Sequence, residues 1–331
     1  MNEKTELIRE ADMKCSFTLR IRDEIFRPGR VRVHLPAPIN ADWLYLGQVL
    51  SSTPLFRMIS LEDHPQRTVW FDEILEENGP FTVTYAYESA PRVVTPDPEV
   101  INKTHQPGND IPLQTIRDYE AREHCDCNSY TGALADRVTI MDLASEAYLT
   151  KTDEAAIERL LGSAHGEFAE LKKKPGELIK SIFSACAGVR DIAASQGKSP
   201  IKPESRNELL VSLMRSCGIP ARWQGGWRLK NGRTVAADWA IVNAAPYGWI
   251  YMDAEAAFEA AANGDKESAE FYFGGIDACR IPTASKLGAA HYPAPDHKRS
   301  DEKYNLHGEA EFEERGLGAE EFFAETVLGM T

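Results

Sequence analysis

One helix start, followed by a helix stop and then by strands, constrains this chain more than any other feature. Residues 205–208 read Ser-Arg-Asn-Glu, which fits the S-x-x-E capping box. In that box a serine hydroxyl and a glutamate carboxylate satisfy backbone N–H groups that a helix N-terminus leaves without partners. The apolar run 209–214 follows at once, and Gly218 and Pro220 then prevent the helix from continuing. The sequence therefore predicts a helix between the serine and the glycine.

Three strand-like segments follow this helix, at 222–229, 239–243 and 248–252. Tryptophan, tyrosine and β-branched residues are frequent in them, and such side chains suit a pleated, half-buried surface. Upstream, helical periodicity or composition extends over 138–174, and a further helix is expected over 178–186. The second part of the chain is therefore expected to contain both helices and strands.

The N-terminal part of the chain has the two-residue period of strands. Phe17, Leu19 and Ile21 alternate with other residues, and the later runs 68–74 and 81–87 are rich in β-branched and aromatic residues. We expect residues 1–90 to form a small antiparallel β-sandwich. The proline-rich segment 91–114 is typical of a linker. Residues 115–331 are then expected to form a second domain with a C-terminal extension.

The C-terminal extension is acidic. The segment 309–325 contains many glutamates together with three phenylalanines. We expect a helix here whose charged face is solvated. In that arrangement Phe312, Phe322 and Phe323 would dock inward.

The charge balance excludes some classes of partner. The chain has 51 acidic and 37 basic residues and a net charge of -14, so nucleic acid and anionic membranes are not expected as main partners. No apolar run approaches the roughly 18 residues of a membrane span, and residues 1–11 are too charged for a signal peptide. Six cysteines scattered over 331 residues then indicate reduced thiols in a cytoplasm.

A short cluster of potential metal ligands occurs at His124, Cys125 and Cys127. A structural zinc site normally has a second pair of ligands, and its cysteines usually lie three positions apart. Because neither condition is met, we predict no metal site and no cofactor. The role of the Cys125 and Cys127 pair stays open.

Several motifs carry a resemblance to a known family. Residues 218–227 read Gly-Ile-Pro-Ala-Arg-Trp-Gln-Gly-Gly-Trp, and 238–240, 246–249 and Asp253 follow in order as Asp-Trp-Ala, Pro-Tyr-Gly-Trp and Asp. This order resembles the transglutaminase-like superfamily, more narrowly a bacterial branch with a β domain ahead of the core. Residues 271–280 are similar to the segment of that branch after the aspartate. The resemblance implies an α+β fold: an N-terminal antiparallel β-sandwich, then a transglutaminase-like (papain-like) core of helices packed on an antiparallel sheet.

In that family a cysteine at a helix N-terminus is the nucleophile, a histidine moves its proton, and an aspartate orients the imidazole. On this chain the cysteine position falls on Pro203 and the histidine position on Ala237, so only Asp253 matches. Proline has no nucleophile, and alanine cannot accept a proton. The resemblance therefore implies a protein that lacks thiol acyl transfer.

Other residues could replace the missing pair. Ser205 lies two positions past the cysteine slot, although its role as a helix N-cap explains it fully. Cys217 lies about 20 Å from the helix start, at about 1.5 Å per residue, and is expected in the core. The remaining candidates would reach the cleft only through tertiary structure, and they are Cys127, Cys186, His124 and His165.

Three carboxylates are expected near the cleft: Glu204, Asp238 and Asp253. If burial separated their pKa values, one could act as an acid and another as a base. The simpler interpretation of Glu204 is a first-turn acid that the helix dipole stabilises.

A set of aromatic and amide side chains accompanies these acids: Trp223, Gln224, Trp227, Trp239, Tyr247 and Trp249. They either pack the strands of the core or line a cleft that holds a ligand by stacking. Two hypotheses follow. The first is a pseudoenzyme that binds a small polar, peptide or sugar ligand, and the second is a diverged enzyme that uses the carboxylates or Ser205. The second requires Glu204, Asp238 and Asp253 to converge in an open pocket. The sequence predicts no oligomeric state.

Overall fold

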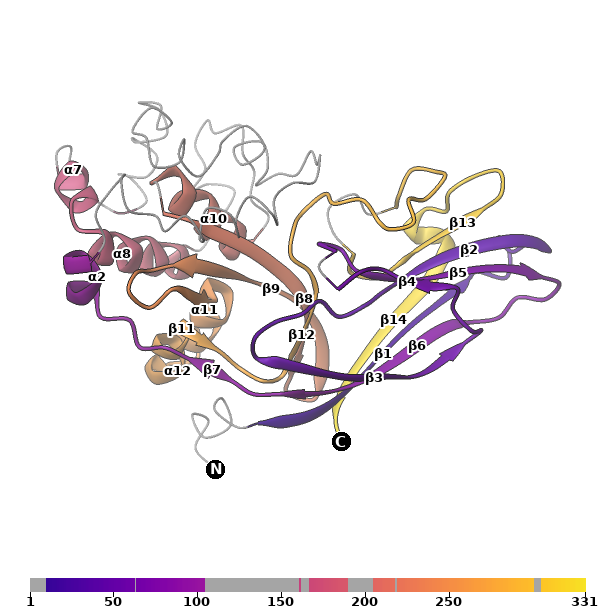
Figure 1. Cartoon of the computed structure of the whole chain (residues 1–331), viewed down its shortest axis with the longest axis horizontal. Coiled ribbons are helices and arrows are strands. Elements are labelled where there is room, and N and C mark those ends of the chain that lie inside the picture. Colours follow the sequence, from indigo (N-terminus) through magenta and orange to yellow (C-terminus); the bar gives the residue numbers. More distant parts are fainter. Residues whose placement is uncertain are drawn as a thin grey trace. The chain divides into compact units, whose positions relative to one another are not determined.

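The structure is a computed structural model that describes residues 10–62, 64–104, 161, 167–189, 205–217, 219–300 and 305–331 (Figure 1). Contacts divide the chain into two compact units. Unit 1 comprises Met1–Ile8, Pro91–Trp223 and Asp238–Ile276, and unit 2 comprises Arg9–Ala90, Gln224–Ala237 and Asp277–Thr331. Within the described ranges, no helix has the length and apolarity needed to cross a membrane.

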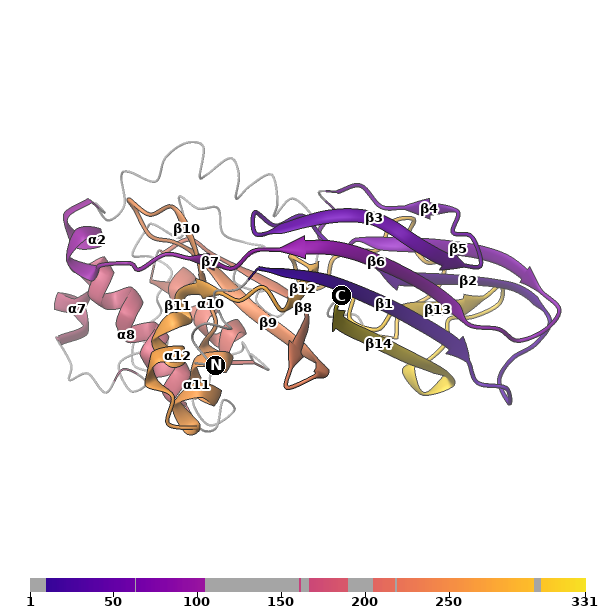
Figure 2. The same ribbon diagram turned by 90° about the horizontal axis from the view of Figure 1, so that it is seen from below.

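Unit 2 is built on two four-stranded antiparallel sheets. The first has the order β14–β1–β6–β3 (Figure 2), and the second has the order β13–β2–β5–β4. The strands of the first sheet are β1 (Ala11–Ile21), β3 (Leu44–Thr53), β6 (Phe81–Ser89) and β14 (Phe322–Met330). Those of the second are β2 (Gly29–Pro36), β4 (Met58–Ile59), β5 (Thr68–Leu75) and β13 (Glu309–Phe312).

The alternation of apolar residues with other residues along the strands explains how the two sheets pack. Phe17 and Leu19 of β1 are fully buried, as are Val33 of β2 and Phe71 of β5. The ring of Phe71 contacts that of Phe81 edge to face, with centroids 5.4 Å apart, which joins the two sheets. The predicted antiparallel β-sandwich is confirmed.

The C-terminal segment differs from its prediction, and the expected helix over 309–325 is wrong. Residues 309–312 form β13, residues 319–321 form a short 3-10 helix and residues 322–330 form β14. β13 pairs with β2, and β14 pairs with β1 along its whole length. Phe322 is buried whereas Phe323 is 56% exposed, which is the two-residue period of a strand. Pairing with distant strands thus overrides the helix-forming composition.

Unit 1 contains helices and an antiparallel sheet. Its strands are β7 (Arg92–Val93), the second half of β9 (Arg233–Asn243), β10 (Trp249–Met252) and β11 (Phe273–Ile276). β10 pairs with β9 and β11, and β11 pairs with β7. The helices are α2 (Pro98–Thr104), α7 (Glu167–Lys172), α8 (Pro175–Gly188), α10 (Arg206–Ser216), α11 (Ala254–Ala262) and α12 (Lys266–Phe271).

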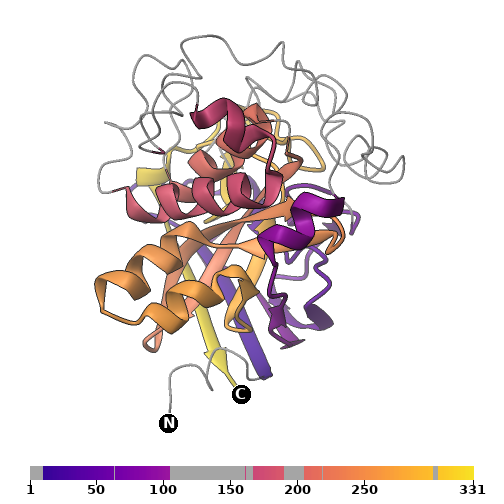
Figure 3. The same ribbon diagram turned by 90° about the vertical axis from the view of Figure 1, so that its left-hand side faces the viewer.

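Helix α8 is the centre of this helical layer, since it contacts α2, α7, α10 and α11 (Figure 3). Its apolar residues Leu178, Ile179, Ile182 and Phe183 are buried, as the sequence period predicts. The predicted helix over 178–186 is therefore confirmed. The predicted linker 91–114 begins with β7 and α2, while its residues after 104 lie outside the described residues, as does the helical pattern over 138–160.

Gly226 allows two strands of unit 2 to approach closely. It lies on β8 (Ala221–Lys230) and pairs with Pro282 of β12 (Arg280–Ala284). A Cβ added at Gly226 would lie 2.0 Å from the carbonyl oxygen of Ile281. Gly226→Ala is therefore expected to lower the free energy of unfolding by about 3 kcal/mol, measured by urea denaturation. Gly79→Ala, where a Cβ meets nothing within 4 Å, is the control; equal losses would contradict the steric explanation.

A buried ion pair makes unit 2 sensitive to acid. Asp277 is buried and accepts from Arg280 at 2.8 and 2.9 Å, and Arg228 lies 3.6 Å away. Burial raises the pKa of Asp277, but the two guanidinium groups and the hydrogen bonds lower it further, to about 2.

Since that pKa lies below its unfolded value, the pair stabilises the fold above about pH 4, and this contribution of about 2 kcal/mol is lost as pH falls toward 2. Asp277→Asn should remove this dependence and cost about 3–5 kcal/mol at neutral pH, because Arg280 is left buried without its charged partner. The measurement is urea unfolding between pH 5 and 2, with the exposed Asp12→Asn as control. An unchanged pH dependence in Asp277→Asn would refute the assignment.

Candidate functional site

The N-terminus of α10 is the centre of a polar network in unit 1. Ser205 is the N-cap, and its hydroxyl oxygen accepts from the backbone N–H of Glu208 at 3.0 Å. The same hydroxyl donates to the carboxylate of Asp238 on β9. The predicted capping role of Ser205 is confirmed. Its hydroxyl also donates to Asp238, one of the acids that the sequence predicts near the cleft.

Asn207, in the first turn of α10, connects three elements. Its side-chain N–H donates to the backbone carbonyl of Asp238 at 2.9 Å, to the Asp238 carboxylate at 3.2 Å and to the Asp253 carboxylate at 3.0 Å. Its carbonyl oxygen accepts from the N–H of Ala254, the first residue of α11, at 2.8 Å. Asn207 is fully buried. The sequence analysis missed Asn207, because it occupies one of the two x positions of the S-x-x-E pattern, where any residue is allowed.

Asp238 is enclosed by donors. The indole N–H of Trp223, on β8, donates to its carboxylate at 2.8 Å, in addition to Ser205 and Asn207. Burial raises the pKa of Asp238, the three hydrogen bonds lower it and the nearby Asp253 raises it again, with a net upward shift. This carboxyl therefore holds a proton at higher pH than an exposed aspartic acid does.

Asp253 has a structural role. It is the N-cap of α11, where its carboxylate accepts from the N–H of Ala256 at 2.9 Å, and the same oxygen accepts from Asn207. Only 3% of the residue is exposed. Asp238 and Asp253 thus both accept hydrogen bonds from the amide of Asn207, which brings together two of the three predicted carboxylates.

The other predicted positions do not all fall in this network. Pro203 and Glu204 lie outside the described residues, and Ala237 is half-buried on β9 directly before Asp238. Trp223 and Trp239 are buried at 3% and 0% exposure, so they pack the interior of unit 1.

Two predicted aromatic residues are half-exposed. The guanidinium of Arg222 lies 3.9 Å above the ring of Trp249, and the hydroxyl of Tyr247 accepts from the backbone N–H of Asp97 at 3.1 Å. Gln224 and Trp227 belong to unit 2, where both are buried and the Trp227 indole donates to the carbonyl of Leu306.

The described thiols of unit 1 are Cys186 and Cys217. Cys186 is fully buried in α8, and burial raises its pKa far above that of a free thiol, against a smaller lowering by Arg206. Cys217 follows the last turn of α10 and is half-buried. The prediction that it lies in the core is therefore wrong. Cys127, His124 and His165 lie outside the described residues. The histidines that the structure describes all belong to unit 2, so the described part of unit 1 pairs no imidazole with a thiol.

Comparisons with known proteins agree with the sequence motifs. Residues 202–254, which include α10, β10 and the network above, match the Transglutaminase-like superfamily. The chain is also similar to a crystal structure from Cytophaga hutchinsonii described as a candidate cysteine protease, with 11% identity, a TM-score of 0.45, and coverage of 97% of this chain and 90% of that one. At this TM-score the similarity supports no conclusion about chemistry. No curated protein matches the chain.

Loss of the Asn207 amide should loosen the start of α10. Asn207→Ala removes the donor shared by Asp238 and Asp253 and leaves the N–H of Ala254 buried without its acceptor, so we expect a loss of about 3 kcal/mol in the free energy of unfolding. Asn207→Asp places a third carboxylate beside two others. The decrease in the free energy of unfolding should therefore be larger at pH 8 than at pH 5, because like charges repel when the carboxylates are ionised. Urea denaturation at both pH values measures this, with the exposed Asn263→Ala as control; a loss below 1 kcal/mol would show that the amide is not a structural link.

Proposed function

We propose that this transglutaminase-like chain binds a small polar, peptide or sugar ligand without thiol acyl transfer. The main support is the state of Asp253, the residue that matches the aspartate of the family. One oxygen of its carboxylate both caps α11 and accepts from Asn207, so that oxygen serves the fold. An aspartate in an acyl-transfer triad orients an imidazole, and the described part of unit 1 contains none.

The state of the two thiols that the structure describes in unit 1 agrees with this proposal. A nucleophilic cysteine needs a depressed pKa and access to the substrate. Burial moves the pKa of Cys186 in the opposite direction, and Cys217 follows the C-terminal end of α10, where the helix dipole disfavours a thiolate.

Tyr247 and Trp249 support the binding part of the proposal. Both are half-exposed; Tyr247 lies in the turn between β9 and β10, and Trp249 is the first residue of β10. Aromatic rings at a surface, together with polar tips, suit the stacking of a sugar or peptide group. The stacked Arg222 also holds the Trp249 ring in place.

One observation favours a second candidate, a diverged hydrolase, lyase or isomerase. The Ser205 hydroxyl donates to Asp238, whose pKa is raised, and Asp253 lies on the other side of Asn207. A carboxyl group whose pKa is raised above its ordinary value is a group that acid–base chemistry uses. In this candidate Asp238 would be the proton carrier.

A ligand screen distinguishes the two candidates. Sugars, amides and amines are tested for a rise in melting temperature, and each hit is then assayed for turnover. We expect stabilisation without turnover, insensitivity of binding to iodoacetamide, and at least tenfold weaker binding in Trp249→Ala. Trp70→Ala, a half-exposed tryptophan of unit 2, should bind normally. Turnover that iodoacetamide abolishes would refute the proposal, and turnover that Asp238→Asn abolishes would establish the second candidate.

A further inference from the structure

One sheet of unit 2 carries a covered outer face. In β2 the side chains of Val33 and Leu35 point into the sandwich, so His34 between them points outward. His34 is nevertheless only 2% exposed. The segment 289–300, called the strap here, contains His291, whose ring lies 5.0 Å from that of His34 at an angle of 43°. The strap therefore covers a residue that would otherwise face solvent.

Polar contacts hold the strap at both ends. Near its start, the carbonyl of Tyr292 accepts from the hydroxyls of Ser60 and Thr68 at 3.2 and 3.4 Å. Near its end, Glu309 accepts from the N–H and hydroxyl of Ser300 at 2.7 and 2.6 Å.

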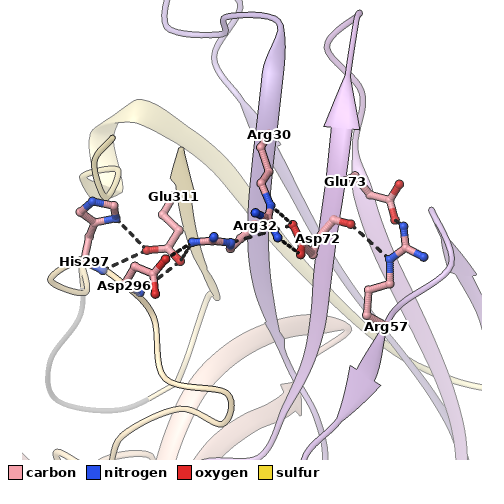
Figure 4. A network of polar contacts seen from close by, with 8 residues as sticks. All are labelled: Arg30, Arg32, Arg57, Asp72, Glu73, Asp296, His297 and Glu311. Carbon is pink, nitrogen blue, oxygen red and sulfur yellow. Dashed lines mark hydrogen bonds and ion pairs between the residues drawn. The ribbon is translucent and has the colours of Figure 1, made fainter. Parts of the chain in front are cut away.

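Between these ends, Glu311 accepts from the backbone N–H groups of Asp296 and His297 at 3.2 and 3.0 Å, and Arg32 contacts both Asp296 and Glu311 (Figure 4). Figure 4 also shows that Asp72 links Arg32 to Arg30 farther along the same face. The strap is thus attached to β13 and, through Arg32, to β2.

The two histidines are the exception within this network. Nε2 of His34 and both ring nitrogens of His291 are buried without a hydrogen-bond partner among the described residues, and Nδ1 of His34 is 3.3 Å from the Thr68 hydroxyl. Burial lowers the pKa of His34 to about 3, and burial, Arg299 and the neighbouring histidines lower that of His291 well below its usual value. Both rings are therefore neutral while the strap is in place.

The charged groups around the pair determine what protonation does. The strap contributes Arg299 and Lys298, β2 contributes Arg32, and His64 stands beside His291. The opposing acids are Glu309 and Glu311 on β13, but Glu309 already lies 3.8 Å from Arg299 and Glu311 already contacts Arg32 and His297. Two imidazolium ions would thus add positive charge to a buried region whose acids already have cationic or polar partners.

We propose that the strap is a cover that mild acid releases: protonation of His34 and His291 drives residues 289–300 off the outer face of the β13–β2–β5–β4 sheet while the sandwich stays folded. The released face presents His34, Arg32, Glu309 and Glu311 to solvent. This is a conformational device of unit 2, and it does not depend on the function proposed for the chain.

The direction and steepness of the pH dependence of strap release follow from the linkage between protonation and opening. In the closed state neither ring binds a second proton. In the open state each ring is protonated with the ordinary histidine pKa of about 6.5. Opening is therefore independent of pH above about 6.5. Below that value it increases by up to tenfold per pH unit for each histidine, or up to about 100-fold for both. The contact between His297 and Glu311 holds the strap to β13 in the closed state.

Hydrogen exchange of the full chain at pH 7.5 and 5.5, corrected for the intrinsic effect of pH on exchange, tests the proposal. We expect protection of strap peptides to fall by about 10- to 100-fold at pH 5.5, whereas peptides from β1 and β6 stay protected. His291→Phe should reduce the change to at most tenfold, and His34→Phe with His291→Phe should abolish it. These substitutions remove no hydrogen bond from His291, and His291→Leu provides a second shape if the phenylalanine does not fit.

His307→Gln is the matched control, because His307 is an exposed histidine of the same unit and its loss should leave the acid response unchanged. The proposal is overturned by any of three results. The strap of the unaltered protein keeps its protection at pH 5.5, the double variant responds like the unaltered protein, or β1 and β6 lose protection together with the strap.

Discussion

The amide of Asn207 is the interaction on which the arrangement of unit 1 depends. It is a donor toward β9 and toward Asp253, and an acceptor for the first N–H of α11. An amide offers two N–H donors and a separate carbonyl acceptor within one short side chain. It supplies the donor that the half-buried Asp238 and the buried Asp253 share, so it holds the two carboxylates on one side chain.

The side chains of this network serve the fold of the segment in which they lie. Helix α10, β10 and Asp253 occupy the segment that matches the transglutaminase-like superfamily. The network at the helix start joins structural elements, and Ser205, Asn207 and Asp253 each satisfy backbone N–H groups. Groups that serve the fold in this way are costly to reuse in catalysis, since a proton transfer would also weaken the helix starts. Asp238 differs from the others, because its carboxylate accepts from side chains alone among the residues that the structure describes.

Local sequence patterns predicted a large part of the fold. The strand period of β1, the apolar face of α8 and the cap at Ser205 all depend on residues close in sequence, and each was found as expected. The convergence of Asp238 and Asp253 was also anticipated as one hypothesis. β13 was not predicted, because its Glu-Ala-Glu-Phe sequence becomes a strand through pairing with β2, and β14 was missed because its first residues were assigned to the acidic helix expected over 309–325. Asn207 and the His34–His291 pair were missed for a related reason: their partners are distant in sequence, and no short motif marks such contacts.

The position of β1 between β6 and β14 has a consequence for biosynthesis. Residues 11–21 are synthesised well before residues 322–330, and the sheet needs both before β1 has a neighbour on each side. Until then one edge of β1, with its row of backbone donors and acceptors, stays open to other chains. The nascent protein must therefore keep an incomplete sandwich from pairing with other chains while residues 91–276 are made, which is the period when chaperones would matter most.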